Sequence, residues 1–200
     1  MQLFISPTSP YARKCRVAVR ERGLTGAVEE VAVDPYANPP ELLAANPVAQ
    51  IPALRTDDGQ VFIDSSLICA WLDTQGDAPP LTPREGAAHW ESRRLEALGD
   101  AILEMAVKRL LEERRAEGEQ SPGWIRRWTR NLERALDVAE KQAPDPTGTL
   151  TMGALTLAIT GPYIDFRLPD LAWRSSRPRL TAFCDAVGER PSFRETRPPQ

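Results

Sequence analysis

The sequence predicts two domains of different class: an α/β domain at residues 1–78 and an all-helical domain at residues 84–200. In the first part, short apolar runs alternate with amphipathic segments, as expected for strands that alternate with helices. A segment rich in proline, glycine and aspartate, DTQGDAPPLTP, then interrupts the pattern, and we place the linker at residues 79–83. No strand signal follows the linker, which is why the second domain is expected to be helical.

The α/β domain is predicted to have the element order βαβαββα. Its strands are expected at residues 2–5, 28–33, 53–55 and 61–63. Asp58-Gly59 separates the last two strands, and this dipeptide is typical of a turn. The first helix is predicted to begin at Pro10, because a serine followed by a proline at the first helical position is a common helix start.

The helical domain is predicted from apolar residues that recur every three or four positions. Two amphipathic helices are indicated by Leu95, Leu98, Ile102 and Met105, and by Ile125, Trp128, Leu132, Leu136 and Ala139. Residues 150–159, LTMGALTLAI, are apolar almost all round and therefore predict a helix buried at the centre of this domain.

The composition favours a small-molecule partner. The chain has 200 residues, of which 42% are hydrophobic and 26% charged, as in ordinary folded proteins. Its net charge of −3 and the lack of a long basic run argue against a general attraction for nucleic acid or for an acidic membrane. Residues 1–6 form too short an apolar run for a signal peptide or a membrane span, so we expect a cytoplasmic protein.

The cysteine and histidine content argues against several kinds of site. Cys15, Cys69 and Cys184 are odd in number, widely separated and without a C-x-x-C pair, which disfavours a disulfide framework and a zinc site. We expect buried, free thiols. With His89 as the single histidine, neither a Ser-His-Asp arrangement nor a metal site can be assembled, and no metal or cofactor is expected.

Ser9 is the first candidate for chemistry. As the residue before Pro10, it places a hydroxyl at the positive end of a helix, where unpaired amides and the helix dipole stabilise an anion. That anion could be a thiolate. The simpler interpretation of Ser9 is a helix cap without any catalytic role.

Four short motifs, in this order along the chain, carry a family resemblance. They are Ser9-Pro10-Tyr11-Ala12, Ile51-Pro52, Asp64-Ser65 and Arg190-Pro191-Ser192-Phe193. Together they resemble the cytosolic glutathione transferases, whose N-terminal domain has the thioredoxin fold. The first motif is similar to the Cys-Pro-Tyr-Ala motif of glutaredoxins and omega-type transferases, with serine in place of cysteine.

The resemblance implies a glutathione site. Ser9 would donate its hydroxyl proton to the glutathione sulfur, and the backbone of Ile51, before a cis Pro52, would pair with the cysteinyl unit. Asp64 would meet the α-ammonium group, while Ser65 would cap its helix and meet the γ-glutamyl carboxylate. The residues implied to bind glutathione are Gln50, Ile51, Pro52, Asp64 and Ser65.

The implied reaction is attack of the glutathione thiolate on an apolar electrophile, bound between the domains near Met105 and Trp128. The family also implies a homodimer. A glutathione-dependent thiol-disulfide reductase is disfavoured, because that mechanism needs a cysteine where Ser9 stands. A non-catalytic glutathione-binding or scaffold protein of the same fold stays open.

Two residues depart from the family pattern. Ala49 stands where glycine is common, which is tolerable if its backbone keeps a negative φ. Ala154 replaces the aspartate of the family's capping box that starts at Thr151, so the cap hydroxyl is kept without its reciprocal carboxylate.

Overall fold

The computed structural model describes residues 1–199 and divides them into two compact units. The first unit contains residues 1–84 together with the C-terminal segment that begins at Arg190, and the second contains Glu85–Glu189. The sequence had suggested that the helical domain runs to the end of the chain, whereas the structure groups its last segment with the α/β unit.

The first unit has the predicted alternation of strands and helices. In chain order, its elements are β1 (Gln2–Ile5), α1 (Pro10–Glu21), β2 (Glu29–Ala32), the 3₁₀ turn η1 (Pro35–Ala37), α2 (Pro40–Ala45), β3 (Ala53–Arg55), β4 (Val61–Ile63), α3 (Ser65–Leu72) and, from the C-terminal segment, α8 (Pro191–Arg194). The four predicted strands are therefore confirmed within residues 1–199.

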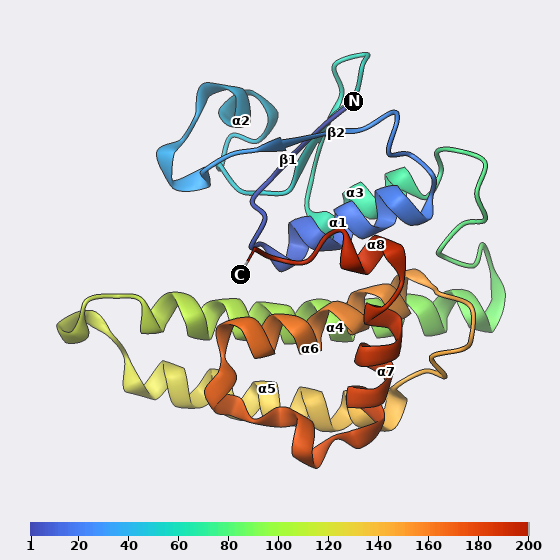
Figure 1. Cartoon of the computed structure of the whole chain (residues 1–200). Coiled ribbons are helices and arrows are strands. Elements are labelled where there is room, and N and C mark those ends of the chain that lie inside the picture. Colours follow the sequence, from blue (N-terminus) through green and yellow to red (C-terminus); the bar gives the residue numbers. More distant parts are fainter. Residues whose placement is uncertain (200) are drawn as a thin grey trace. The chain divides into compact units, whose positions relative to one another are not determined.

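The strands form a mixed sheet in the order β2-β1-β3-β4 (Figure 1). β1 pairs with β2 in parallel, whereas β1 with β3 and β3 with β4 are antiparallel pairs. The parallel pair is connected through α1, as a parallel pair requires a crossover. This mixed sheet with its helices is the thioredoxin-like fold that the resemblance implied.

Both faces of the sheet are covered. Phe4 and Ala53, which pair across β1 and β3, form a buried cluster with Leu42 and Ala45 of α2. Side chains alternate along a strand, so the neighbouring pair of Leu3 and Leu54 points to the opposite face, and both are fully buried. α1 and α3 lie side by side in this unit (Figure 1).

The described residues of the second unit form helices joined by loops, and no strand. Its elements are α4 (Gly86–Glu113), η2 (Glu117–Glu119), α5 (Pro122–Gln142), α6 (Met152–Arg167), η3 (Pro169–Leu171), η4 (Trp173–Ser176) and α7 (Pro178–Gly188). α6 contains the segment predicted to be a central helix, and most of its residues are buried, against α4 on one side and α7 on another.

Gly153, at the start of α6, stands where this helix packs closely against α4. A Cβ atom on Gly153 would lie 2.3 Å from the backbone oxygen of Ser92, so α4 and α6 can approach this closely only at a glycine. The Thr151 side chain accepts the amide of Ala154 at 3.2 Å and caps the helix without an acidic partner in the first turn, as the sequence predicted.

Residues 1–199 lack two features, a helix suited to cross a membrane and a cluster of metal-binding side chains. No helix there combines the length and the apolar character that crossing a membrane requires. That part of the chain also contains no group of three or more histidine, cysteine, aspartate or glutamate side chains that could hold a metal ion.

Candidate functional site

The candidate residues lie at one edge of the sheet. Phe4, Ala53 and Ile63 form one row across β1, β3 and β4, as their pairing shows. The segments that follow β1, precede β3 and follow β4 therefore leave the sheet from the same edge. These segments carry Ser9, the residues before Ala53 and the start of α3, respectively, so motifs far apart in the sequence are brought together.

Ser9 is the N-cap of α1, as predicted. Its Oγ accepts the backbone amide of Ala12 at 3.2 Å, and its own amide donates to the Ser6 carbonyl at 3.0 Å. The side chain is half-buried. A serine hydroxyl has one proton to donate as well as lone pairs, and within residues 1–199 Ser9 Oγ donates to no protein atom. Its proton is therefore available to a ligand.

The loop before β3 contains the predicted cis peptide bond between Ile51 and Pro52. The condition under which alanine would be tolerable at position 49 is not met: the φ of Ala49 is +53°, in the left-handed region, rather than negative. Because the family often has glycine at this place, the structure shows that the alanine adopts the glycine conformation at the steric cost of its Cβ.

Asn46 holds this loop and was missed by the sequence reasoning. It is buried, its Nδ2 donates to the Gln50 carbonyl at 2.8 Å, and its Oδ1 accepts the amide of Val48 at 3.2 Å. Asparagine side chains that bond to the backbone two residues later are typical of turns, which was the available signal. No hydrogen bond of the Ile51 backbone occurs among the described residues, and the Gln50 side chain is exposed.

The start of α3 differs from the prediction. Asp64, not Ser65, is the N-cap: its Oδ1 accepts the amides of Ser66 at 2.8 Å and Leu67 at 3.2 Å, and its φ is +72°. Ser65 is the first residue of the helix and is buried, with a 6% exposed fraction. Aspartate caps a helix at least as well as serine and tolerates a left-handed backbone, which explains the difference.

Side-chain hydrogen bonds connect α1 with the first residues of α3. The Nζ atom of Lys14, a fully buried side chain that sequence reasoning had also missed, donates to Ser66 Oγ at 3.0 Å. The Sγ atom of Cys15 donates to the Ser65 carbonyl at 3.7 Å, and Cys69 Sγ lies 3.8 Å from Cys15 Sγ. The predicted burial of these two thiols is confirmed, and neither forms a disulfide.

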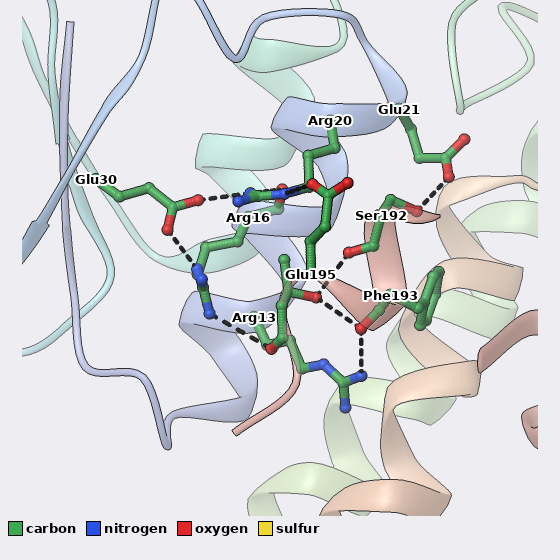
Figure 2. Close-up of polar contacts among 9 residues, drawn as sticks. Arg13, Arg16, Arg20, Glu21, Glu30, Ser192, Phe193 and Glu195 are labelled. Carbon is green, nitrogen blue, oxygen red and sulfur yellow. Dashed lines mark hydrogen bonds and ion pairs between the residues drawn. The ribbon is translucent and has the colours of Figure 1, made fainter. Parts of the chain in front are cut away.

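The C-terminal segment packs against α1 (Figure 2). Glu21, at the end of α1, pairs with Arg190 Nη2 at 2.8 Å and accepts a short hydrogen bond from Ser192. Burial alone would raise the pKa of Glu21, but the hydrogen bonds from Arg190 and Ser192 outweigh it and hold that pKa below its ordinary value. The Arg190-Pro191-Ser192-Phe193 motif is thus a brace for the helix that carries Ser9.

Comparison with family models decides the identity of both units. Residues 3–80 match the model "Glutathione S-transferase, N-terminal domain", and residues 122–186 match "Glutathione S-transferase, C-terminal domain". The chain belongs to the glutathione S-transferase family.

Individual relatives match this glutathione S-transferase family member along its whole length. "Uncharacterized GST-like protein YibF" of Escherichia coli K12 is 30% identical over 100% of both chains. A glutathione transferase family member from Pseudomonas fluorescens Pf-5, solved with bound glutathione, is 37% identical, covers 100% of this chain and 99% of its own, and superposes with a TM-score of 0.94. The same relative solved with S-(propanoic acid)-glutathione gives 0.90 with full coverage of both chains.

Proposed function

We propose that the protein is a glutathione transferase that holds the glutathione thiolate at Ser9 and adds it to an apolar electrophile. One observation carries the proposal: the Ser9 helix start, the Ile51 backbone before a cis proline and the Ser65 helix start leave the sheet at one edge. The family relatives solved with glutathione or a glutathione conjugate support the same ligand for this chain.

The spacing of the two helix starts suits an extended tripeptide. Cys15 stands beside the Ser65 carbonyl, and it follows Ser9 by six residues, which is about 9 Å along a helix axis. The sulfur of glutathione belongs to its middle residue, and the γ-linked glutamyl arm extends about 8 to 9 Å from that sulfur to the α-carboxylate. A glutathione molecule with its sulfur at Ser9 therefore reaches Ser65 with its γ-glutamyl end.

The protein offers a suitable group to the cysteinyl unit and to the γ-glutamyl end of the ligand. The Ile51 amide and carbonyl pair with the cysteinyl backbone as an added strand would. The buried Ser65 hydroxyl and the Ser65 amide receive the γ-glutamyl carboxylate, because Asp64 already accepts the amides of Ser66 and Leu67. Asp64 uses Oδ1 for its cap and keeps Oδ2 for the α-ammonium group. Gln50 and Pro52 complete the proposed contacts.

The chemistry follows from the Ser9 environment. A free thiol with a pKa of about 8.5 is mostly protonated at neutral pH. The Ser9 hydroxyl proton and the positive end of the α1 dipole favour the thiolate, whose proton passes to solvent. The sulfur then forms a bond to the electrophilic carbon, and the leaving group departs with its electron pair.

Turnover of chlorodinitrobenzene with glutathione tests the proposal, with the Ser9→Ala variant as the matched control. The expected result is release of chloride and formation of the thioether by the wild-type protein. Retention on a glutathione column without turnover would instead favour a non-catalytic binding protein. Reduction of a mixed disulfide would favour the reductase, which the serine at position 9 disfavours.

We also propose a homodimer. Val61 and Ile63 of β4 and Leu67 of α3 are exposed, with exposed fractions of 48%, 39% and 52%. Apolar side chains gathered on neighbouring elements are typical of a covered surface, and two-fold dimers are the commonest oligomers. A sedimentation mass near the 22.2 kDa of one chain at micromolar concentration contradicts this proposal.

A further inference from the structure

The arginines of α1 that lie beside the C-terminal segment differ in how their charge is balanced (Figure 2). Glu30 of β2 lies 2.7 Å from Arg16 Nε and also pairs with Arg20. Arg20 pairs in addition with Glu195 of the C-terminal segment, at 3.1 Å. Glu21 pairs with Arg190, as described above. Each carboxylate of this network therefore already serves an arginine.

Arg13 is the exception. Its exposed fraction is only 4%, and its Nη2 donates to the uncharged Phe193 carbonyl at 3.1 Å. The guanidinium carbon lies 5.9 Å from the centre of the Phe193 ring. Arg13 Nε, which is buried, has no hydrogen-bond partner among the described residues. Among residues 1–199, Arg13 thus has no carboxylate partner for its buried charge.

The surrounding charges increase this imbalance. Burial, and then repulsion from Arg197 and Arg16, lower the pKa of Arg13 to about 10, so its side chain still carries a positive charge at neutral pH. Of the other elements packed against α1, α3 contributes Asp64, whose carboxylate caps that helix, and the C-terminal segment contributes Glu195, which serves Arg20. A buried charge without a partner is costly unless something else compensates it.

Arg13 is also placed to act on the Ser9 region. Its backbone amide donates to the Ser9 carbonyl at 3.0 Å, so it stands one helical turn after Ser9. Residues separated by four positions share one face of a helix, and side chains lean toward the N-terminus. Because Arg13 is buried, solvent screens its charge less than it would screen a charge on the surface.

We propose that the buried charge of Arg13 stabilises the glutathione thiolate at Ser9, and that the bound anion supplies the negative charge that no carboxylate of residues 1–199 provides to Arg13. This inference rests on the proposed function. Arg13 acts through its electric field and through the position that Phe193 gives it, without contact with the sulfur. The C-terminal segment thereby contributes to the chemistry at the other end of the chain.

Two neutral variants, Arg13→Met and Arg13→Gln, test the proposal, and Arg13→Lys keeps the charge. The pKa of bound glutathione is read from the ultraviolet absorbance of the thiolate. Both neutral variants are expected to raise that pKa by about 1, which means about tenfold less thiolate below it. The rate loss should be about tenfold at low pH and should disappear at high pH. Arg13→Lys should resemble the wild type.

Two controls separate charge from structure. Arg16→Gln removes a neighbouring arginine that Glu30 neutralises, and it should leave the thiol pKa unchanged. S-methylglutathione has no ionisable thiol, so its affinity should be the same in the Arg13→Met variant and the wild type. An equal loss of affinity for S-methylglutathione and glutathione would show that Arg13 is merely structural and would overturn the proposal.

Three further outcomes would also overturn the inference about Arg13. An unchanged thiol pKa in either folded neutral variant overturns the role of Arg13 alone. A thiol pKa in Arg13→Lys that is as high as in the neutral variants overturns it as well, because the charge would then not matter. If the wild-type protein itself does not lower the pKa of bound glutathione, the proposed function fails together with this inference.

Discussion

Asn46 and Gln50 fix the loop that leads to the cis proline: the Asn46 Nδ2 atom donates to the Gln50 carbonyl at 2.8 Å from a side chain that is 2% exposed. The chain between these residues turns through Ala49 at a φ of +53°. The buried amide therefore closes a turn whose backbone conformation is unfavourable for alanine, directly before the Ile51 backbone that we propose pairs with glutathione.

The Ala49→Gly variant should be more stable than the wild type. Relief of the left-handed conformation is worth about 1 to 2 kcal/mol, whereas the added freedom of glycine in the unfolded chain costs about 0.4 to 1 kcal/mol. The expected gain is thus between zero and about 1.6 kcal/mol in the free energy of unfolding, measured by urea denaturation. The control Ala44→Gly, at an exposed position of α2, should lower stability by about 1 kcal/mol. A loss of stability in Ala49→Gly contradicts the assigned φ.

The loop between Asn46 and Gln50 also shows which features could not be predicted from the sequence. Strand positions and the Ser9 cap were predictable, because apolar alternation and a Ser-Pro helix start are local signals. The φ of Ala49 was not, since it depends on the buried Asn46 and on the strand that follows. Likewise, Asp64 and Ser65 are both good caps, and their sequence does not show which one begins the helix.

Replacing Ser9 by alanine should leave a folded protein that still binds glutathione. Loss of the cap costs about 1 kcal/mol of stability. Loss of one donor to a developing anion should raise the pKa of the bound thiol and slow turnover by roughly ten- to a thousand-fold. The thiolate absorbance titration measures the first effect, and Thr8→Ala is the control. An unaltered thiol pKa would transfer the role to Thr8 or Ser6.

The brace at the C-terminus should weaken in acid. Because the pKa of Glu21 is lowered in the folded protein, its contribution to stability is present above the ordinary pKa of about 4.3 and is lost as the pH falls through the folded value. Glu21→Gln should cost about 1 to 2 kcal/mol at neutral pH, a value reduced because Arg190 is 43% exposed. Urea denaturation at several pH values should show wild type and variant converging in acid.

The exposed Glu29 provides the comparison, since Glu29→Gln should have little effect at any pH. A difference between Glu21→Gln and the wild type that persists in acid contradicts the assigned pairing. This brace was hidden from the sequence for a physical reason. Glu21 and Arg190 are separated by 169 positions, and no local pattern connects them.

The start of α3 gives the sharpest test of the glutathione site, because the structure separates capping from ligand binding. Asp64 is the cap, so Asp64→Ala should lower stability by about 1 kcal/mol as well as weaken glutathione binding. Ser65 has no capping role, and Ser65→Ala should weaken binding by about 1 to 3 kcal/mol, the range for hydrogen bonds to charged groups, with little change in melting temperature.

Calorimetric titration of glutathione into both variants, together with their melting curves, measures the two effects separately. Asp64→Asn is the informative third variant: asparagine also caps helices and tolerates a positive φ, so stability should be kept while the charge that meets the α-ammonium group is lost. Weaker binding in Asp64→Asn without a change in melting temperature therefore isolates the ionic contact. Unchanged affinity in both Ser65→Ala and Asp64→Asn would exclude the start of α3 from the glutathione site.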